Sequence, residues 1–191
     1  MSIVVYANTV NKEIHKSAFE AVSYGAQLAE KSGDTVTAVV AGEASGLESL
    51  GNYGADKVLH LQDDKLNDFQ PSLIAKAVKA VAESEGADVI VFTHDLSGKS
   101  IAPICSALMN AGLVSGAVAL PVTEGGFVVK KAVFSGKAYA HVRIDSTQKI
   151  VSVMPNSVDK KEYGKTSSVE SFSTDLGDSR LKVVEQRIES T

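Results

Sequence analysis

Two hydrophobic periods alternate through the first half of the chain. Four short apolar runs have the length and composition of strands that are covered on both faces of a sheet: residues 3–7, 35–41, 57–61 and 88–93. Between them, apolar residues recur at the spacing of amphipathic helices. Strand, helix and strand in this order predict parallel strands with right-handed crossovers. We therefore expect a three-layer α/β/α fold with a mostly parallel sheet.

Three longer helices are predicted between these runs, with a shorter one over residues 45–52. The first starts at Ser17, with Glu20 three residues later as in a capping box, and ends at Gly33. The second has Pro71 in its first turn, where the missing N–H is harmless. The third is predicted from an apolar stripe of four residues, Ile101, Ile104, Cys105 and Leu108.

The pattern changes after about residue 121. Strand-like runs follow at residues 127–134, 138–144 and 149–153, separated by short polar turns. In the middle run apolar and polar residues alternate, which is typical of a half-exposed antiparallel strand. We therefore expect an antiparallel β extension beginning near residue 121.

The last part of the chain, residues 159–191, is rich in Ser, Lys and Glu. Residues 167–173 and 181–188 have a strand-like composition, but they offer little apolar surface for a core. We expect this part to be a tail or linker that packs weakly or against another body.

Composition and charge narrow the classes of protein. With 191 residues the chain can bury a sizeable core, and no apolar run approaches the length of a membrane span. The first residues lack the pattern of a signal peptide. The single cysteine, Cys105, excludes an internal disulfide and fits a reducing cytosol, so we expect a cytoplasmic protein. A net charge of -4 without a long basic run argues against nucleic acid as a partner.

Ser97, Gly98 and Lys99 follow a strand and open a helix, as a phosphate-binding loop does. Such a loop needs a glycine five positions before Gly98, and Thr93 occupies that position. Asp95 also places a negative charge where a phosphate would be bound. The sequence therefore argues against nucleotide hydrolysis at this loop.

A weaker ligand site remains at the same place. Helix N-terminal amides at the carboxyl end of a central strand often bind ligands in open α/β sheets. The candidate residues for this loop are Thr93, His94, Ser97, Gly98 and Lys99. The alternative interpretation is an ordinary strand-to-helix turn, with His94 a solvated loop histidine.

Metal and nucleophilic chemistry find no support in the pattern. The four histidines lack the spacing of metal ligands, there is no second cysteine for a zinc site, and no nucleophile elbow is present. We interpret Cys105 as a buried hydrophobic residue, because it lies on an apolar helix stripe. We expect neither a metal site nor a catalytic residue.

Six short segments, taken in order, carry a resemblance to a known family. They are residues 3–7, 54–58 (Gly-Ala-Asp-Lys-Val), 98–103 (Gly-Lys-Ser-Ile-Ala-Pro), 112–116, 134–138 (Phe-Ser-Gly-Lys-Ala) and 149–153. Together they cover about residues 1–158 and resemble the N-terminal domain of the alpha (large) subunit of electron transfer flavoprotein. The chain departs from the family at Met154 and Ile104, where the family usually has Arg.

The resemblance implies an adenine-nucleotide alpha hydrolase-like domain over residues 1–158, followed by a linker toward an absent FAD-binding domain. It implies an electron-transfer component that serves as scaffold and beta-subunit interface, with FAD in the complete heterodimer and none in this chain alone. Flavin dehydrogenases and a membrane-bound quinone oxidoreductase are implied as indirect partners. The alternative is a stand-alone adenine-nucleotide-binding module of universal-stress type, which would need a glycine-rich phosphate turn between Thr93 and Ser100.

Overall fold

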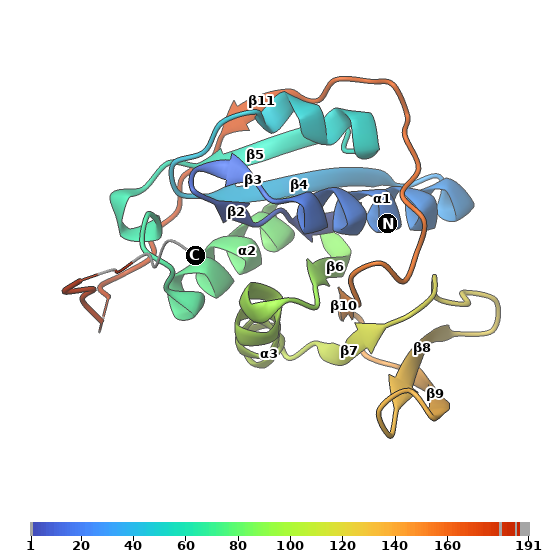
Figure 1. Ribbon diagram of the computed structural model, residues 1–191. Helices are drawn as coiled ribbons and strands as arrows, with labels where there is room; N and C mark the ends of the chain where they lie inside the picture. The colour runs from blue at the N-terminus through green and yellow to red at the C-terminus, as the bar shows by residue number, and fades with distance from the viewer. Residues whose placement is uncertain (1, 180, 186, 188–191) are drawn as a thin grey trace.

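The computed structural model describes residues 2–179, 181–185 and 187, and a nine-stranded sheet forms its centre (Figure 1). The strands of this sheet are β1 (Ser2–Tyr6), β4 (Thr35–Ala41), β5 (Lys57–Leu61), β6 (Ala87–Thr93), β7 (Gly112–Ala117), β8 (Phe127–Val133), β9 (Ala138–Ile144), β10 (Lys149–Val153) and β11 (Ser168–Ser171). They are ordered β11-β5-β4-β1-β6-β10-β7-β8-β9. The pairs from β11 to β7 are parallel, and β8 and β9 are antiparallel, which confirms the predicted fold class.

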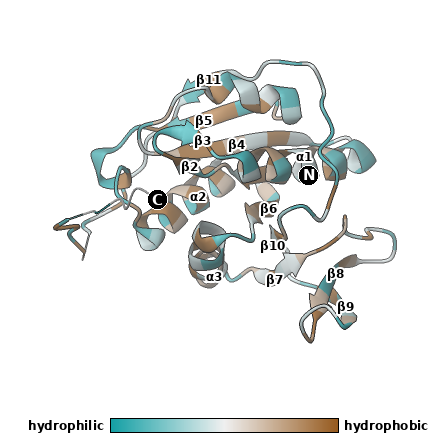
Figure 2. Ribbon diagram, viewed as in Figure 1, coloured by the Kyte–Doolittle hydropathy of each residue, from teal (hydrophilic) through white to brown (hydrophobic). Residues whose placement is uncertain are grey.

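Helices cover both faces of the sheet. They are α1 (Lys16–Ser32), α2 (Pro71–Ser84) and α3 (Leu96–Met109), with the 3-10 helices η1 (Leu47–Tyr53) and η2 (Asp64–Leu66), and a small hairpin of β2 (Thr9–Val10) and β3 (Glu13–Ile14). Alternate residues of β1 divide between two cores: Ile3 and Val5 pack under α1, while Val4 and Tyr6 pack under α2 and α3. Figure 2 shows hydrophobic residues along the central strands, between the two layers.

β10 lies inside the parallel part of the sheet, between β6 and β7. Ile150 pairs with Ile90 of β6 on one side and with Leu113 of β7 on the other. The strand itself was predicted, but it does not belong to the antiparallel extension, which consists of β8 and β9. Ile150 and Val151 are both buried, as in any parallel strand covered on two faces.

The start of α1 differs from the predicted capping box. The cap is His15, whose Nδ1 accepts the Ser17 N–H at 3.3 Å. Ser17 is the second residue of the helix, and its hydroxyl donates to Asp95 Oδ2 at 3.1 Å. The predicted end is confirmed, since Gly33 adopts φ 72° and its N–H donates to Ala29 O at 2.8 Å.

The buried stripe of α3 also differs at its end. Ile101 and Cys105 are fully buried as predicted, but Leu108 is 41 % exposed. The next position on the stripe is Met109, four residues after Cys105, and the two sulfur atoms are 3.4 Å apart. Met109 therefore closes the stripe in place of Leu108.

Residues 158–177, which we call the C-terminal strap, cross the surface from β10 and run along β5 (Figure 1). Tyr163 N donates to Asn52 O at 2.7 Å, β11 pairs with β5, and Leu176 is 2 % exposed in the core under α2. The expectation of weak packing is wrong for the strap. Of the second strand-like run, residues 186 and 188 lie outside the described residues, and the described ones form no strand.

Among the described helices, none combines the length and the apolar content that crossing a membrane requires.

Candidate functional site

The loop between β6 and α3 lies at the carboxyl edge of the central strands. The residues that the sequence singled out lie around it: Thr93 ends β6, His94 is in the loop, and Ser97, Gly98 and Lys99 are in the first turn of α3. Thr93 is 3 % exposed, and its hydroxyl is buried without a hydrogen-bond partner among the described residues. Lys99 is exposed.

Gly98 is required by packing between the helix and the strand. A Cβ at this position would lie 1.7 Å from the carbonyl oxygen of Thr93. Only a residue without a side chain lets α3 start so close to the end of β6. The glycine that suggested a phosphate loop therefore has a structural explanation.

The Asp95 carboxylate fills the anion position of this loop. Its Oδ1 accepts the Gly98 N–H at 2.9 Å, which caps α3. Its Oδ2 accepts hydrogen bonds from Asn8 Nδ2 at 2.9 Å and from Ser17 Oγ at 3.1 Å. A negative side chain thus occupies the place at the helix N-terminus where a phosphate would be favoured. This geometry does not favour the adenine-nucleotide alternative.

Asn8 and Ser17 were not among the residues that the sequence identified for this site. Asn8 follows the apolar run of β1 directly, and parallel strands present their carboxyl ends at one edge. The position of Asn8 at the end of this run is the sequence signal that points to it.

His94, which follows β6, takes part in a hydrogen-bonded contact with β10 and β7. Its Nδ1 lies 2.9 Å from Ser152 Oγ of β10, and the same hydroxyl accepts the Gly116 N–H of β7 at 3.2 Å. Burial lowers the pKa of His94, and the positive charges of Lys99 and Lys131 lower it further. The structure places His94 half-buried in this contact, whereas the simpler sequence interpretation had it in solvent.

The remaining candidates lie apart from this loop. Cys105 is buried, and burial raises the pKa of its thiol to about 12. His60 Nε2 contacts Gly42 O at 2.8 Å inside the fold, while His141 is exposed on β9. In the described part of the chain, no group of three or more His, Cys, Asp or Glu residues could hold a metal ion.

The β8–β9 hairpin, residues 127–144, projects from one end of the sheet (Figure 1). All its charged residues other than histidine are basic, namely Lys130, Lys131, Lys137 and Arg143. Phe134 is 79 % exposed and Tyr139 is 58 % exposed, with Lys130 Nζ 4.1 Å from the Tyr139 ring centroid. Exposed aromatic and basic residues on an edge strand are typical of a contact surface for another protein.

These features define an α/β domain whose central loop is filled by its own side chains and whose sheet ends in a projecting hairpin. The sequence model of the electron transfer flavoprotein domain matches residues 3–176, and the chain belongs to this family. The resemblance identified from the ordered segments is confirmed. The match also includes most of the C-terminal strap.

Several relatives are similar to the chain over most of its length. The electron transfer flavoprotein subunit alpha of Bacillus subtilis is 31% identical over 188 residues, which is 96% of this chain and 57% of the relative. The subunit alpha of Syntrophomonas wolfei is 28% identical over 155 residues, which is 79% of this chain and 47% of the relative. An acryloyl-CoA reductase electron transfer subunit beta of Anaerotignum propionicum is 27% identical over 128 residues, which is 66% of this chain and 35% of the relative. The chain spans about half the length of the subunits alpha that it matches.

Neither the two cavities at α1 nor the β6–α3 loop fits a flavin dinucleotide. The two cavities at the surface of α1 measure about 190 and 270 Å³, whereas sites for ligands of drug size or larger usually start near ~300 Å³. At the β6–α3 loop, the Asp95 carboxylate would repel a pyrophosphate.

Proposed function

We propose that the chain is the N-terminal domain of an electron transfer flavoprotein alpha subunit. In this function it is a component of an electron carrier and contributes scaffold and subunit interface, without a catalytic residue of its own. The observation that carries the proposal is the family match over residues 3–176. The relatives of Bacillus subtilis and Syntrophomonas wolfei are named as alpha subunits, which supports the same assignment.

FAD belongs, in this proposal, to the complete heterodimer. The flavin would supply the electron-accepting and electron-donating chemistry, and regions outside this chain would hold most of it. The poor fit of the β6–α3 loop to a dinucleotide supports this division of roles. Residues 159–191 would then lead toward the FAD-binding part. Flavin dehydrogenases and a membrane-bound quinone oxidoreductase are the indirect partners that follow from this role.

The β8–β9 hairpin is the part of the chain that we propose for the beta-subunit contact. It is basic within a chain of net charge -4, so it favours an acidic partner surface. Exposed Phe134 and Tyr139 supply the rigid aromatic area that contact surfaces use. β9 is the edge strand of the sheet and leaves one side of its backbone for pairing.

Size-exclusion chromatography of the chain with an electron transfer flavoprotein beta subunit and FAD tests this function. We expect the two proteins to elute together. The substitution Tyr139→Asp should weaken the complex at least about tenfold, because it places a charge in the contact. Val169→Asp is the matched control, since Val169 is 38 % exposed on β11, the strand at the opposite edge of the sheet from β9. Separate elution of the unmodified proteins would contradict the proposal.

Visible absorbance gives a second, independent test. After incubation with FAD and desalting, the chain alone should carry no flavin absorbance. Stoichiometric retention of flavin by the isolated chain would show that this domain holds the cofactor itself.

A further inference from the structure

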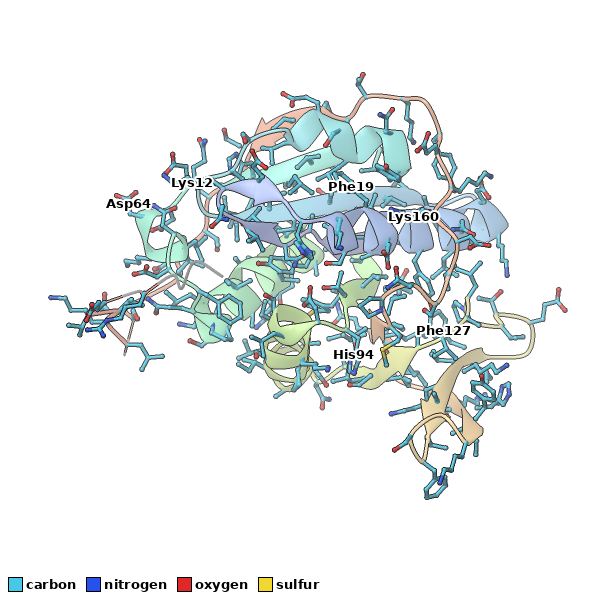
Figure 3. All side chains as sticks on the ribbon, in the orientation of Figure 1. Lys12, Phe19, Asp64, His94, Phe127 and Lys160 are labelled. Atoms are coloured by element: carbon cyan, nitrogen blue, oxygen red, sulfur yellow. The ribbon has the colours of Figure 1, made fainter. Side chains whose placement is uncertain are left out.

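An apolar cavity of about 190 Å³ opens at the amino edge of the sheet, at the end opposite the β6–α3 loop. It lies between the last turns of α1, the first residues of three central strands and the turn that leads into β8. Its floor consists of four buried apolar residues, Ile3, Leu28, Val89 and Phe127. Phe127, at the start of β8, is labelled in Figure 3.

The cavity has a size that matches a single ring. A dry cavity of about 150 Å³ lined by aliphatic and aromatic side chains is large enough to bind benzene. The present cavity is somewhat larger and is open to solvent at one side, so a ring can enter with a short substituent directed outward. Water gains little here, because a water molecule needs two or more polar partners and the floor offers none.

The mouth of the cavity carries a positive charge. Lys149 lines it from the start of β10, and its Nζ lies 5.8 Å from the centroid of the Phe127 ring. The ammonium donates to Thr147 O at 2.7 Å, and within the described residues it forms no ion pair with a carboxylate. Two of its three N–H donors are therefore available to an acceptor at the mouth.

The mouth also has an acidic residue, Asp34, on the side of α1 and not on the side of β10. Asp34 follows α1, and its carboxylate accepts a hydrogen bond from Ser32 Oγ. A ligand whose negative group points toward β10 would approach Lys149 from the side away from this helix. The distribution of charge thus gives the ligand an orientation.

We propose that this cavity binds a small aromatic carboxylate, with the ring on the apolar floor and the carboxylate at Lys149. The ring would replace surface that is now exposed to water, and the carboxylate would receive charge-assisted hydrogen bonds from the ammonium. The site is separate from the β6–α3 loop and lies at the base of the β8–β9 hairpin, where Phe127 begins β8.

Methyl-resolved NMR of the full chain, titrated with phenylacetate, tests the proposal. We expect saturable shifts of the methyl groups of Ile3, Leu28 and Val89. The methyl groups of Ile74 and Ile101, in the core on the opposite face of the sheet, should not shift. Shifts that stay linear with concentration, or that spread over both faces, would overturn the proposal.

Two variants distinguish the contribution of the ligand's ring to binding from the contribution of its carboxylate. Lys149→Met should weaken phenylacetate about fivefold and leave the neutral analogue 2-phenylethanol unchanged, because only the charged hydrogen bond is lost. Lys137→Met is the matched control, since Lys137 is exposed in the hairpin turn. Leu28→Phe should abolish binding of both compounds by filling the cavity, with circular dichroism to check the fold. Equal affinity of all variants for phenylacetate would show that the cavity is not the site.

Discussion

At the scale of single residues, the β6–α3 loop depends on Asp95. Its carboxylate accepts three hydrogen bonds, from the α3 backbone, from Asn8 and from Ser17. The sequence identified Asp95 as an acid that would repel phosphate, and it placed the loop correctly at the end of a strand. It could not reveal the two side-chain donors, because they are 87 and 78 residues away along the chain.

Removal of this carboxylate should destabilise the fold. Asp95→Ala removes the α3 cap and leaves the Asn8 amide without its acceptor, so we expect a loss of about 2 kcal/mol in the free energy of unfolding. Urea denaturation measures it. The exposed Asp145→Ala is the control and should change stability by less than about 0.5 kcal/mol. A neutral result for Asp95→Ala would mean that the cap contributes nothing.

Thr93 should respond in the opposite direction. Its buried hydroxyl has no partner among the described residues, and such a group carries a desolvation penalty. We expect Thr93→Val to raise the free energy of unfolding by about 1 kcal/mol. Thermal denaturation of both proteins checks this, and a loss of stability would show that the hydroxyl has a partner in solution.

His94 should make stability depend on pH. Burial holds its pKa below the usual value, so the unfolded chain binds more protons as the pH falls through about 6.5. The stability contributed by neutral His94 is then lost toward acid. We expect His94→Gln to reduce the fall in stability between about pH 7.5 and pH 5.5. Denaturation midpoints across this range measure the effect, with the exposed His141→Gln expected to follow the unmodified protein.

At the scale of elements, most strands and helices could be predicted, but their neighbours in the sheet could not. The apolar run of β10 indicates a strand whether it lies at an edge or at the centre. Its place between β6 and β7 is set by long-range pairing, which a local pattern does not encode. The close packing of the strap could not be predicted either. Its deeply buried apolar residue, Leu176, lies in a polar segment, so the local pattern gives no sign of a core contact.

The strap should contribute measurably to stability. Leu176→Ala removes a buried side chain from the core under α2, and we expect a loss of about 2–4 kcal/mol. Leu181→Ala is the matched control, because Leu181 is 65 % exposed just beyond the strap. If both variants unfold at the same urea concentration, the strap does not stabilise the core.

At the scale of the whole molecule, family membership could be inferred from the sequence because weak segments occurred in a consistent order. The individual segments carry little information, and Gly98 is an example. The residue is a glycine because a side chain would collide with the Thr93 carbonyl oxygen, but in the sequence the same glycine resembles part of a phosphate-binding motif. The proposed role as scaffold rests on the family and not on any single residue. Neither the hairpin's projection nor the apolar cavity was visible in the pattern.

A nucleotide titration tests this view of the whole domain. We expect no saturable heat when ATP is added to the chain in a calorimeter, since the anion position is occupied by Asp95. Lys99→Ala should behave like the unmodified protein. Submillimolar binding that is lost in Lys99→Ala would instead favour the adenine-nucleotide module.

The position of β10 has a consequence for synthesis of the chain. β6 and β7 both leave the ribosome before the strand that lies between them, and residues 118–148 must follow first. At about 5–20 residues per second, the two strands wait roughly two to six seconds with unpaired backbone edges. During that interval the nascent chain offers two open sites for strand pairing with other proteins. Chaperone protection should therefore matter most for this protein while the hairpin is being translated.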